Sequence, residues 1–296
     1  TDLDRITAGW QKADLIILAA RPGMGKTAFV LSMARNIGVD FNIPVAMFSL
    51  EMSSIQLVTR LISSETQLSA DKLKKGNLEN YEWEQLNAKI GKLVDAPIYI
   101  DDTPALSIFE LRAKCRRLKA QYDIQIIIVD YIQLMSTGED NKGNREQEIS
   151  TISRSLKALA KELSVPIITL SQLNRSVETR AGSKRPILSD LRESGAIEQD
   201  ADLVCFIYRP EYYKLEQDEQ GNSTRGMAEL IIAKHRNGPL GDIRMQFIDK
   251  FAKFTDYEGG SIEQSAGMPS GYEYPGENSY TVASKMNELP EEDQPF

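Results

Sequence analysis

The sequence has few of the residues that build metal centres, disulfide frameworks or membrane spans. Its 296 residues include one histidine and two cysteines, which cannot supply the ligands of a usual four-ligand zinc site. Cys115 and Cys205 fall in a helical pattern and an apolar strand pattern, so we expect two buried, reduced thiols. No run approaches the roughly 18 apolar residues of a membrane span, and no signal peptide opens the chain. These features predict a cytoplasmic protein with no membrane partner.

An excess of positive charge, the usual sign of a nucleic-acid binder, is also missing. The formal net charge is -8, but residues 257–296 alone carry eight acids and one lysine. Residues 1–256 are then close to neutral, with 34 basic and 35 acidic residues, so contact with phosphate is not excluded. We expect one large domain over 1–256 and an acidic, disordered tail over 257–296. Because the chain begins with Thr1 rather than Met, we also expect a fragment that lacks a preceding domain.

Short apolar runs alternate with amphipathic segments along most of the chain. Two segments have the spacing of surface helices, Ser107–Gln121 and Ile149–Leu163. This alternation predicts an α/β domain with a mostly parallel central sheet flanked by helices. The expected parallel strands are Leu15–Ala20, Val45–Leu50, Ile98–Ile100, Ile124–Val129, Pro166–Leu170 and Leu203–Tyr208.

Near the C-terminal end the pattern changes to that of an antiparallel hairpin. Met227–Ala233 and Ile243–Ile248 are strand-like runs on either side of a turn sequence that contains Asn237-Gly238. The polar segment Glu211–Arg225, which precedes them, is expected to be a surface excursion. The sequence therefore predicts a C-terminal antiparallel hairpin that closes the sheet.

A phosphate-binding loop follows the first expected strand. The segment from Ala20 to Thr27 leads directly into a helical run, and in this setting backbone N–H groups and a helix N-terminus hold phosphates. Lys26 is expected to reach the terminal phosphates of ATP, and Thr27 to bind Mg²⁺. The alternative is a glycine-containing turn ahead of a structural helix. The predicted nucleotide-binding residues here are Arg21, Pro22, Gly23, Met24, Gly25, Lys26, Thr27 and Ala28.

Three polar residues follow other expected strands, so they should lie beside this loop at the carboxyl edge of the sheet. Asp130 ends a run of four aliphatic residues and can orient Mg²⁺ through water. Glu51 can hold a water against the γ-phosphate, and a place at the start of a helix ahead of Ser53 is an equal alternative. Gln172 can sense the γ-phosphate, or it is an ordinary loop residue.

Seven segments, in order along the chain, carry a resemblance to a known family: Ala19–Thr27, Phe48–Met52, Asp130–Met135, Ser155–Leu163, Ser171–Arg175, Ser189–Asp202 and Lys234–Gly238. They closely resemble the motor domain of the bacterial DnaB replicative helicases, from about Thr1 to Tyr257. The resemblance implies a RecA-like P-loop fold and assembly into a six-subunit ring. It also implies ATP-driven movement along single-stranded DNA in the 5′→3′ direction.

The same resemblance assigns roles to individual residues. It makes Glu51 the catalytic base, Asp130 the Walker-B carboxylate and Gln172 the switch after the third motif. It makes Lys234 and Arg236 the pair that reaches the nucleotide of the adjacent subunit. Lys26 and Thr27 keep the roles that the loop predicts, with Thr27 and Asp130 at the metal.

Single-stranded DNA is expected against the loops that follow this switch. By resemblance, Arg192, Glu193 and Gly195 lie on the DNA backbone, where N–H groups and one guanidinium contact phosphate. For Lys184 and Arg185 in the same loops, a solvated position is an equal alternative. In the family, an N-terminal domain that helps form the ring and contacts primase precedes the motor. Primase and a helicase loader are therefore expected partners of the full-length protein.

Other interpretations of three features stay open. Two other classes of protein have the same core. Strand exchange without unwinding would favour a RecA-type recombinase. ATP turnover that does not respond to DNA would favour a regulatory P-loop ATPase that binds only proteins. Trp10, Tyr208 and Arg209 can border the adenine, or Trp10 anchors the core. The terminal Glu291–Phe296 is similar to the tips of bacterial single-strand-binding proteins, so it is either a docking peptide for replication proteins or a solubilising extension.

Overall fold

The computed structural model describes residues 2–138, 145–180, 183–218 and 221–257, apart from the side chains of residues 192–194 and 196. The tail predicted at 257–296 lies outside the described residues from residue 258 onward, and so does the proposed docking peptide Glu291–Phe296. Among the described residues, no helix has both the length and the apolar character needed to cross a bilayer.

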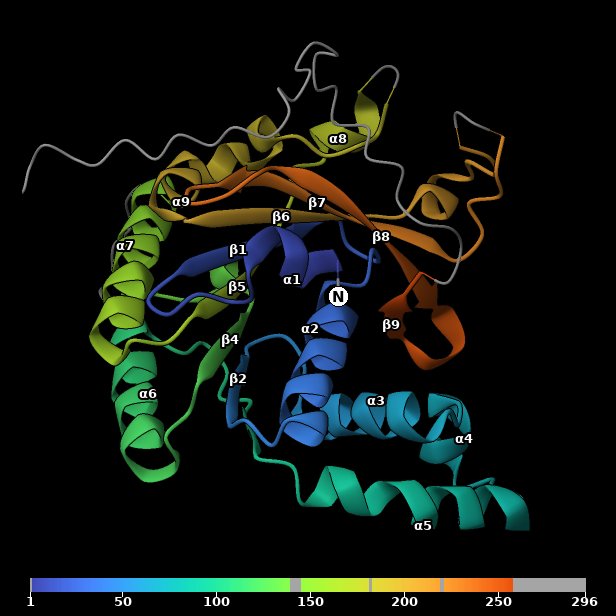
Figure 1. Cartoon of the computed structure of the whole chain (residues 1–296). Coiled ribbons are helices and arrows are strands. Elements are labelled where there is room, and N and C mark those ends of the chain that lie inside the picture. Colours follow the sequence, from blue (N-terminus) through green and yellow to red (C-terminus); the bar gives the residue numbers. More distant parts are fainter. Residues whose placement is uncertain (1, 139–144, 181–182, 219–220, 258–296) are drawn as a thin grey trace, which may run out of the picture. The chain divides into compact units, whose positions relative to one another are not determined.

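One sheet runs through the described part of the chain, in the order β3-β2-β4-β5-β1-β6-β7-β8-β9 (Figure 1). The strands from β3 to β6 pair in parallel, and those from β6 to β9 pair antiparallel. The predicted mostly parallel sheet and its C-terminal hairpin are confirmed. The strands are β1 (Leu15–Ala20), β2 (Val45–Ser49), β3 (Ile98–Asp101), β4 (Ile126–Asp130), β5 (Ile167–Gln172), β6 (Leu203–Tyr208), β7 (Met227–His235), β8 (Gly241–Ile248) and β9 (Lys253–Asp256).

Helices cover both faces of this sheet. In Figure 1, α6 and α7 lie on one side of the strands and α2 on the other. The α-helices are α1 (Asp2–Thr7), α2 (Lys26–Arg35), α3 (Ser54–Thr66), α4 (Ala70–Lys75), α5 (Asn80–Val94), α6 (Ile108–Tyr122), α7 (Arg145–Leu163), α8 (Ser176–Thr179) and α9 (Gly195–Asp200). The shorter helical turns are η1 (Asn36–Asp40), η2 (Ile132–Leu134), η3 (Leu188–Ser194), η4 (Pro210–Tyr213) and η5 (Asp249–Phe251).

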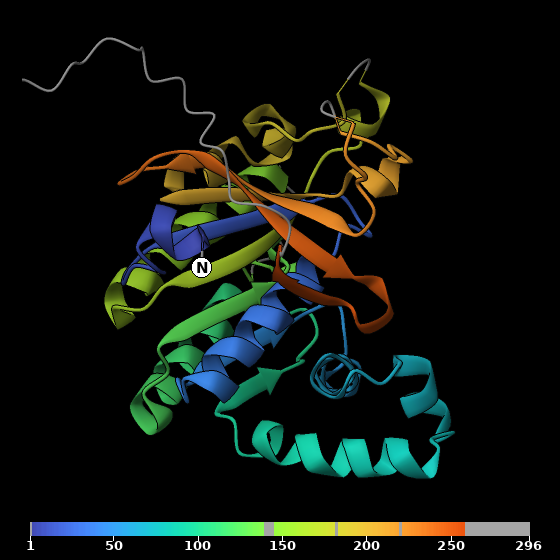
Figure 2. The ribbon, with the colours of Figure 1, turned by 45° about the vertical axis from the view of Figure 1, so that its right-hand side comes forward.

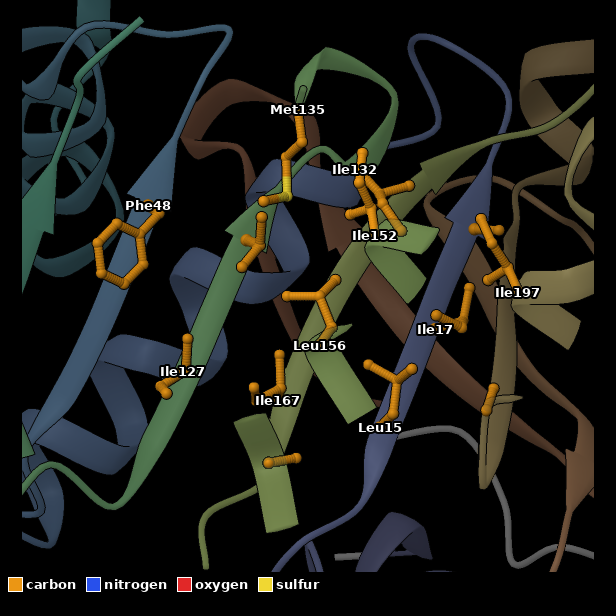
Figure 3. Close-up of a cluster of buried hydrophobic side chains, with 14 of the residues drawn as sticks. Leu15, Ile17, Phe48, Ile127, Ile132, Met135, Ile152, Leu156, Ile167 and Ile197 are labelled. Carbon is orange, nitrogen blue, oxygen red and sulfur yellow. The ribbon is translucent and has the colours of Figure 1, made fainter. Parts of the chain in front are cut away.

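The central strand β1 shows why a continuous apolar run becomes a buried strand. Successive side chains of a strand point to opposite faces, so alternate residues of β1 enter two different clusters. Leu15 and Ile17 lie on the face covered by α7 and α9, which contribute Leu156 and Ile197 to the same cluster (Figure 3). Ile16 and Leu18 pack with α2 and α3 on the other. Burying each of these side chains contributes about 1.5–3 kcal/mol, which fixes the position of the loop that follows β1.

Two parts of the fold were not predicted from the sequence. Helices α3, α4 and α5 form a separate layer outside α2 (Figure 2). Strand β9 adds a third antiparallel strand beside β8. The prediction that Cys115 and Cys205 are buried, unpaired thiols is confirmed; burial raises the pKa of the Cys205 thiol to about 12.

Candidate functional site

The loop between β1 and α2 has the backbone geometry of a phosphate cradle. Gly23 and Gly25 have φ angles of +78° and +98°, a conformation that glycine adopts at little cost. A Cβ at Gly25 would come within 3.0 Å of the Phe254 ring, so a larger residue there is strained and crowded. Helix α2 begins directly after, at Lys26, with its N-terminal N–H groups facing the loop.

Lys26, Thr27 and Asp130 meet at the carboxyl ends of β1 and β4. The Lys26 ammonium donates to the Ala20 carbonyl at 3.0 Å, and burial lowers its pKa against the opposing charges of Asp130 and Glu51. The Thr27 hydroxyl donates to Asp130 Oδ2 at 2.7 Å. Burial raises the pKa of Asp130, while the Thr27 hydrogen bond opposes the rise. A hydroxyl and a buried carboxylate are thus held together beside a half-buried cation.

A pocket of about 500 Å³ opens in front of this loop. A volume of this order suits a small-molecule ligand, and cations outnumber acids on its walls. The charged residues that line it are Lys26, Arg60, Lys74, Arg209 and Lys250, with Glu51 and Asp249. The pocket therefore favours an anionic ligand of nucleotide size.

Arg209 forms part of the wall of this pocket beside the phosphate loop. Its guanidinium carbon lies 3.9 Å from the centre of the Phe247 ring, and Nη1 donates to the Gly23 carbonyl at 3.3 Å. Burial lowers the pKa of Arg209. The two aromatic residues considered with Arg209 do not line the pocket. Tyr208 is buried in the core on the α7 face of the sheet, and Trp10 packs against the core on the α2 face. Of the three candidates for the adenine border, Arg209 lines the pocket.

Glu51 lines the same pocket and is exposed. Its alternative role at the start of a helix is not supported. Helix α3 begins at Ser54, and its cap is made by Ser53 and Gln56, each hydrogen-bonded to the backbone of the other. The Glu51 carboxylate takes no part in this cap, so it is available to the pocket.

Gln172 lies at the end of β5, where its backbone is paired with Ala20 of the phosphate loop. Gln133, which the sequence analysis did not single out, holds this strand end in place. Its Nε2 donates to the Ser171 hydroxyl at 2.8 Å, and its Oε1 accepts from the Gln172 N–H at 3.3 Å. The exposed Gln172 side chain is therefore mounted beside the pocket on a fixed backbone.

Two residues of the predicted phosphate loop turn their side chains away from the pocket. Arg21 is buried; its Nε donates to Glu178 at 2.9 Å and Nη1 to the Leu173 carbonyl at 2.8 Å. Met24 packs in the core. Any contact of these two residues with a nucleotide would have to come from their backbone.

Lys234 and Arg236 lie at the opposite end of the sheet from the phosphate loop. The Arg236 N–H donates to the carbonyl of Asp202, whose side chain accepts from Leu15, the first residue of β1. The phosphate loop follows the last residue of β1, roughly 16 Å away at the rise of a strand. Arg236 therefore cannot reach the phosphate loop of its own chain.

The residues predicted to contact DNA are only partly described. Gly195 is exposed and begins α9, whereas the side chains of Arg192 and Glu193 lie outside the described residues. The two neighbouring cations, Lys184 and Arg185, are half-buried and bonded within the chain rather than solvated. Lys184 donates to the Arg180 carbonyl at 2.8 Å, and Arg185 pairs with Glu229 and Asp242.

Comparison with known proteins agrees with this geometry. A sequence profile of the DnaB-like helicase C terminal domain matches residues 1–256. The chain belongs to this family. The replicative DNA helicase DnaB of Geobacillus stearothermophilus is 51% identical over 258 residues, which cover 87% of this chain and 56% of that protein. The replicative DNA helicase DnaC of Bacillus subtilis is 48% identical over 271 residues, covering 92% and 58%.

Solved structures of similar proteins have the same fold. One, described as an ATPase domain, superposes with a TM-score of 0.80 at 39% identity, covering 87% of this chain and 89% of that one. A DnaB-like replicative helicase, described with its interactions with primase, also gives 0.80 at 39% identity, covering 87% and 60%. The predicted resemblance and RecA-like P-loop fold are confirmed. The chain spans about half the length of the curated relatives it matches.

Sequence reasoning missed several residues of the DnaB-like site. Arg60, Lys74 and Lys250 line the pocket from α3, α4 and η5, and none was a candidate. The capping signal Ser53-Ser54-Ile55-Gln56 would have revealed α3 and placed Arg60 two turns into it. No local signal marks Lys250, because η5 reaches the pocket only through the pairing of β8 with β9.

Proposed function

We propose that this chain is the ATP-hydrolysing motor of a ring-forming replicative helicase, which moves 5′→3′ along single-stranded DNA and unwinds duplex DNA. The observation that carries the proposal is the site at the carboxyl edge of the sheet, where Lys26 and Thr27 line a cationic pocket and Thr27 is hydrogen-bonded to the buried Asp130. Family membership and relatives named replicative DNA helicases support it.

In this proposal the phosphate loop binds the triphosphate of ATP. The backbone of Pro22–Thr27 and the N-terminus of α2 surround the phosphates, and Lys26 lies against their terminal groups. Ala28 continues the helix behind the loop. Arg209 borders the base side of the pocket, where its guanidinium plane can stack on a nucleobase.

The residues present fit Mg²⁺ as the accompanying ion. Thr27 and Asp130 offer oxygen donors 2.7 Å apart, and Mg²⁺ commonly takes one or two protein ligands and completes its shell with phosphate oxygens and water. The described residues contain no cluster of three His, Cys, Asp or Glu side chains, in keeping with such an open shell. When bound, Mg²⁺ would neutralise charge on the phosphates.

Hydrolysis in the proposal uses Glu51 as the base. Its exposed carboxylate lines the pocket and is free of the α3 cap, so it can orient a water and accept its proton. Gln172, on the fixed end of β5, senses the γ-phosphate. Because β5 leads into α8 and the loops after it, a shift at Gln172 can pass to the proposed DNA contacts Arg192, Glu193 and Gly195.

The site is completed in the proposal by an adjacent subunit. Arg236 and Lys234 stand at the amino edge of the sheet, out of reach of their own phosphate loop. A head-to-tail contact between the two edges of neighbouring chains gives a closed ring, for which we propose six subunits. Primase and a helicase loader are proposed partners of the assembled protein; one structural relative is described with its interactions with primase.

The experiment that tests this function is ATP turnover by the assembled protein with and without single-stranded DNA, together with its mass in solution. The proposal predicts stimulation by DNA, unwinding of a forked duplex and the mass of six chains. Turnover indifferent to DNA would instead favour a regulatory ATPase. Strand exchange without unwinding would favour a recombinase.

A further inference from the structure

Asp202 joins three segments at the amino edge of the sheet. It lies between α9 and β6, and its side chain is 6% exposed. Oδ2 accepts from the Leu15 N–H at 2.8 Å and from the Lys157 ammonium. Oδ1 faces Arg236 Nη1 at 3.2 Å. One oxygen is thus fixed to the sheet and α7, while the other holds the arginine.

The end of α9 provides a second attachment for the same arginine. Arg236 Nη2 donates to the Gln199 carbonyl at 3.1 Å, and the Lys234 ammonium donates to the Glu198 carbonyl at 2.6 Å. The last carbonyls of a helix have no partner within it and favour cations. Lys234, near the end of β7, and Arg236, just after it, therefore both cap α9.

These contacts leave the arginine both held and accessible. Asp202 is nearly buried, whereas the Arg236 side chain is 50% exposed. A guanidinium has five N–H donors in a rigid plane; the hydrogen bond to Gln199 uses one at Nη2, and Nη1 forms the ion pair with Asp202. The remaining donors are available to an anion outside the chain. A long side chain fixed in this way loses less freedom on meeting such an anion.

We propose that Asp202 is a positioning residue for Arg236, holding its guanidinium in the orientation in which it meets the phosphates bound by the adjacent subunit. The inference rests on the proposed function, because it requires that Arg236 act across a subunit contact. The Leu15 backbone N–H fixes the Asp202 carboxylate to the start of β1, and Lys157 balances its charge. Asp202 and the Gln199 carbonyl then hold Arg236. Asp14, 3.9 Å from Lys157, belongs to the same cluster and contacts Lys157 rather than Arg236.

The test uses Asp202→Asn in the assembled protein, with Lys157→Met as the matched control. Both changes disturb the same buried ion pair, but Lys157→Met leaves the Asp202–Arg236 contact in place. Asp202→Asn is expected to lower kcat by about tenfold to a hundredfold, the effect of misplacing a reacting group by an ångström or less, with the Kd for ATP unchanged. Lys157→Met is expected to lower Tm while keeping kcat within about twofold below that Tm, because stability and positioning are separate.

Mixtures of variants separate positioning from general damage. Asp202→Asn subunits have an intact pocket, so mixing them with Glu51→Gln subunits, whose Arg236 is intact, should restore turnover. Mixing them with Arg236→Ala subunits should not. Any of three results would overturn the proposal. Asp202→Asn could turn over ATP normally, Lys157→Met could lose as much kcat as Asp202→Asn, or Glu51→Gln subunits could fail to restore the turnover that Asp202→Asn loses. If Arg236→Ala alone is fully active, the shared site itself is wrong, and positioning of Arg236 falls with it.

Discussion

The charged groups at the two edges of the parallel sheet differ in how exposed they are to solvent. At the carboxyl edge, Lys26 and Asp130 lie next to a pocket. Burial lowers the pKa of Lys26 and raises the pKa of Asp130, so it favours the neutral form of each. At the amino edge, Arg236 is half exposed and held by a buried carboxylate. One edge is built to receive an anion, and the other presents a cation to something outside the chain.

Under the proposed function, this difference means that neither edge alone is a complete reaction centre. The pocket is lined by the phosphate loop and Glu51, with Asp130 hydrogen-bonded to Thr27 behind it, but its described lining contains neither Lys234 nor Arg236. Strand β1 connects the edges rigidly, since both ends of it are buried. Placed head to tail, two copies of the chain would bring one edge against the other. Substitutions at the two edges, and at the proposed DNA contact, can break or sharpen this comparison.

The largest effect is expected from removing the cation at the amino edge. Arg236→Ala should lower kcat by about 10³-fold or more, the range for an arginine that stabilises charge on a transferring phosphoryl group. Arg112→Ala is the matched control, because its side chain is 49% exposed and also paired with a carboxylate, Glu162. Steady-state ATP turnover measures both. If both substitutions had equally small effects on kcat, Arg236 would only form a surface ion pair and would have no role in the reaction.

A smaller loss is expected at the carboxyl edge when the base is removed. Glu51→Gln keeps the shape of the side chain but cannot accept a proton, so kcat should fall by about 10²-fold or more while ATP still binds. Lys26→Ala should abolish ATP binding instead, because it removes the cation that faces the phosphates. Nucleotide affinity and turnover, measured for both variants, separate the two roles. Normal turnover in Glu51→Gln would exclude it as the base.

DNA binding should respond more modestly, and independently of both edges. Arg192→Ala should weaken all single strands about equally, because phosphate contacts do not depend on sequence, and should reduce the salt slope of log K by about 0.7. Arg185→Ala is a useful comparison, since Arg185 is already paired with Glu229 and Asp242 and should alter affinity less. Titrations of single-stranded DNA at several salt concentrations test this prediction. An unchanged salt slope for Arg192→Ala would exclude a contact between Arg192 and phosphate.

The smallest effect concerns stability without nucleotide. Burial raises the pKa of Asp130, so the folded chain takes up this proton at a higher pH than the unfolded chain. The charged carboxylate therefore costs stability at neutral pH, and the cost disappears as pH falls below the ordinary pKa. Asp130→Asn should raise Tm by about 2 °C or more at pH 7, with little difference near pH 4, while ATP turnover is lost.

Replacing Asp101 should change Tm in the direction opposite to that expected for Asp130→Asn. Although burial opposes it, hydrogen bonds from Lys114 and Thr103 lower the pKa of Asp101. Its charged form therefore stabilises the fold at neutral pH, and this contribution is lost as pH falls through the folded pKa. Asp101→Asn should lower Tm at pH 7. A fall in Tm for both variants would contradict the argument from burial at Asp130.

The carboxyl edge was largely predictable from the sequence because its signals are local. A strand, a glycine-containing loop and a helix follow one another within 21 residues, and β1 was predicted with its observed bounds. Glu51 and Asp130 each stand directly after an apolar run. Their meeting follows from parallel pairing, which brings the carboxyl ends of neighbouring strands together.

The amino edge could not be predicted in the same way. Asp202 and Arg236 are 34 residues apart, and nothing in either segment indicates that one holds the other. Their contact depends on the register of β6 with β7, which includes a bulge beside Val204. Likewise β9 is four residues of mixed polarity, Lys253–Asp256, that pair only because β8 is already in place. Contacts set by long-range register leave little trace in local sequence patterns.

The most direct test of the central claim, that the two edges of neighbouring chains form one reaction centre, is ATP turnover by a mixture of Arg236→Ala and Glu51→Gln subunits. Each variant alone lacks one half of every site. In an equal mixture that assembles at random, about a quarter of the head-to-tail contacts combine an intact Glu51 pocket with an intact Arg236. The account predicts that turnover reappears in the mixture while both parents stay inactive. No recovery in rings that contain both subunits, or full activity of Arg236→Ala by itself, would contradict it.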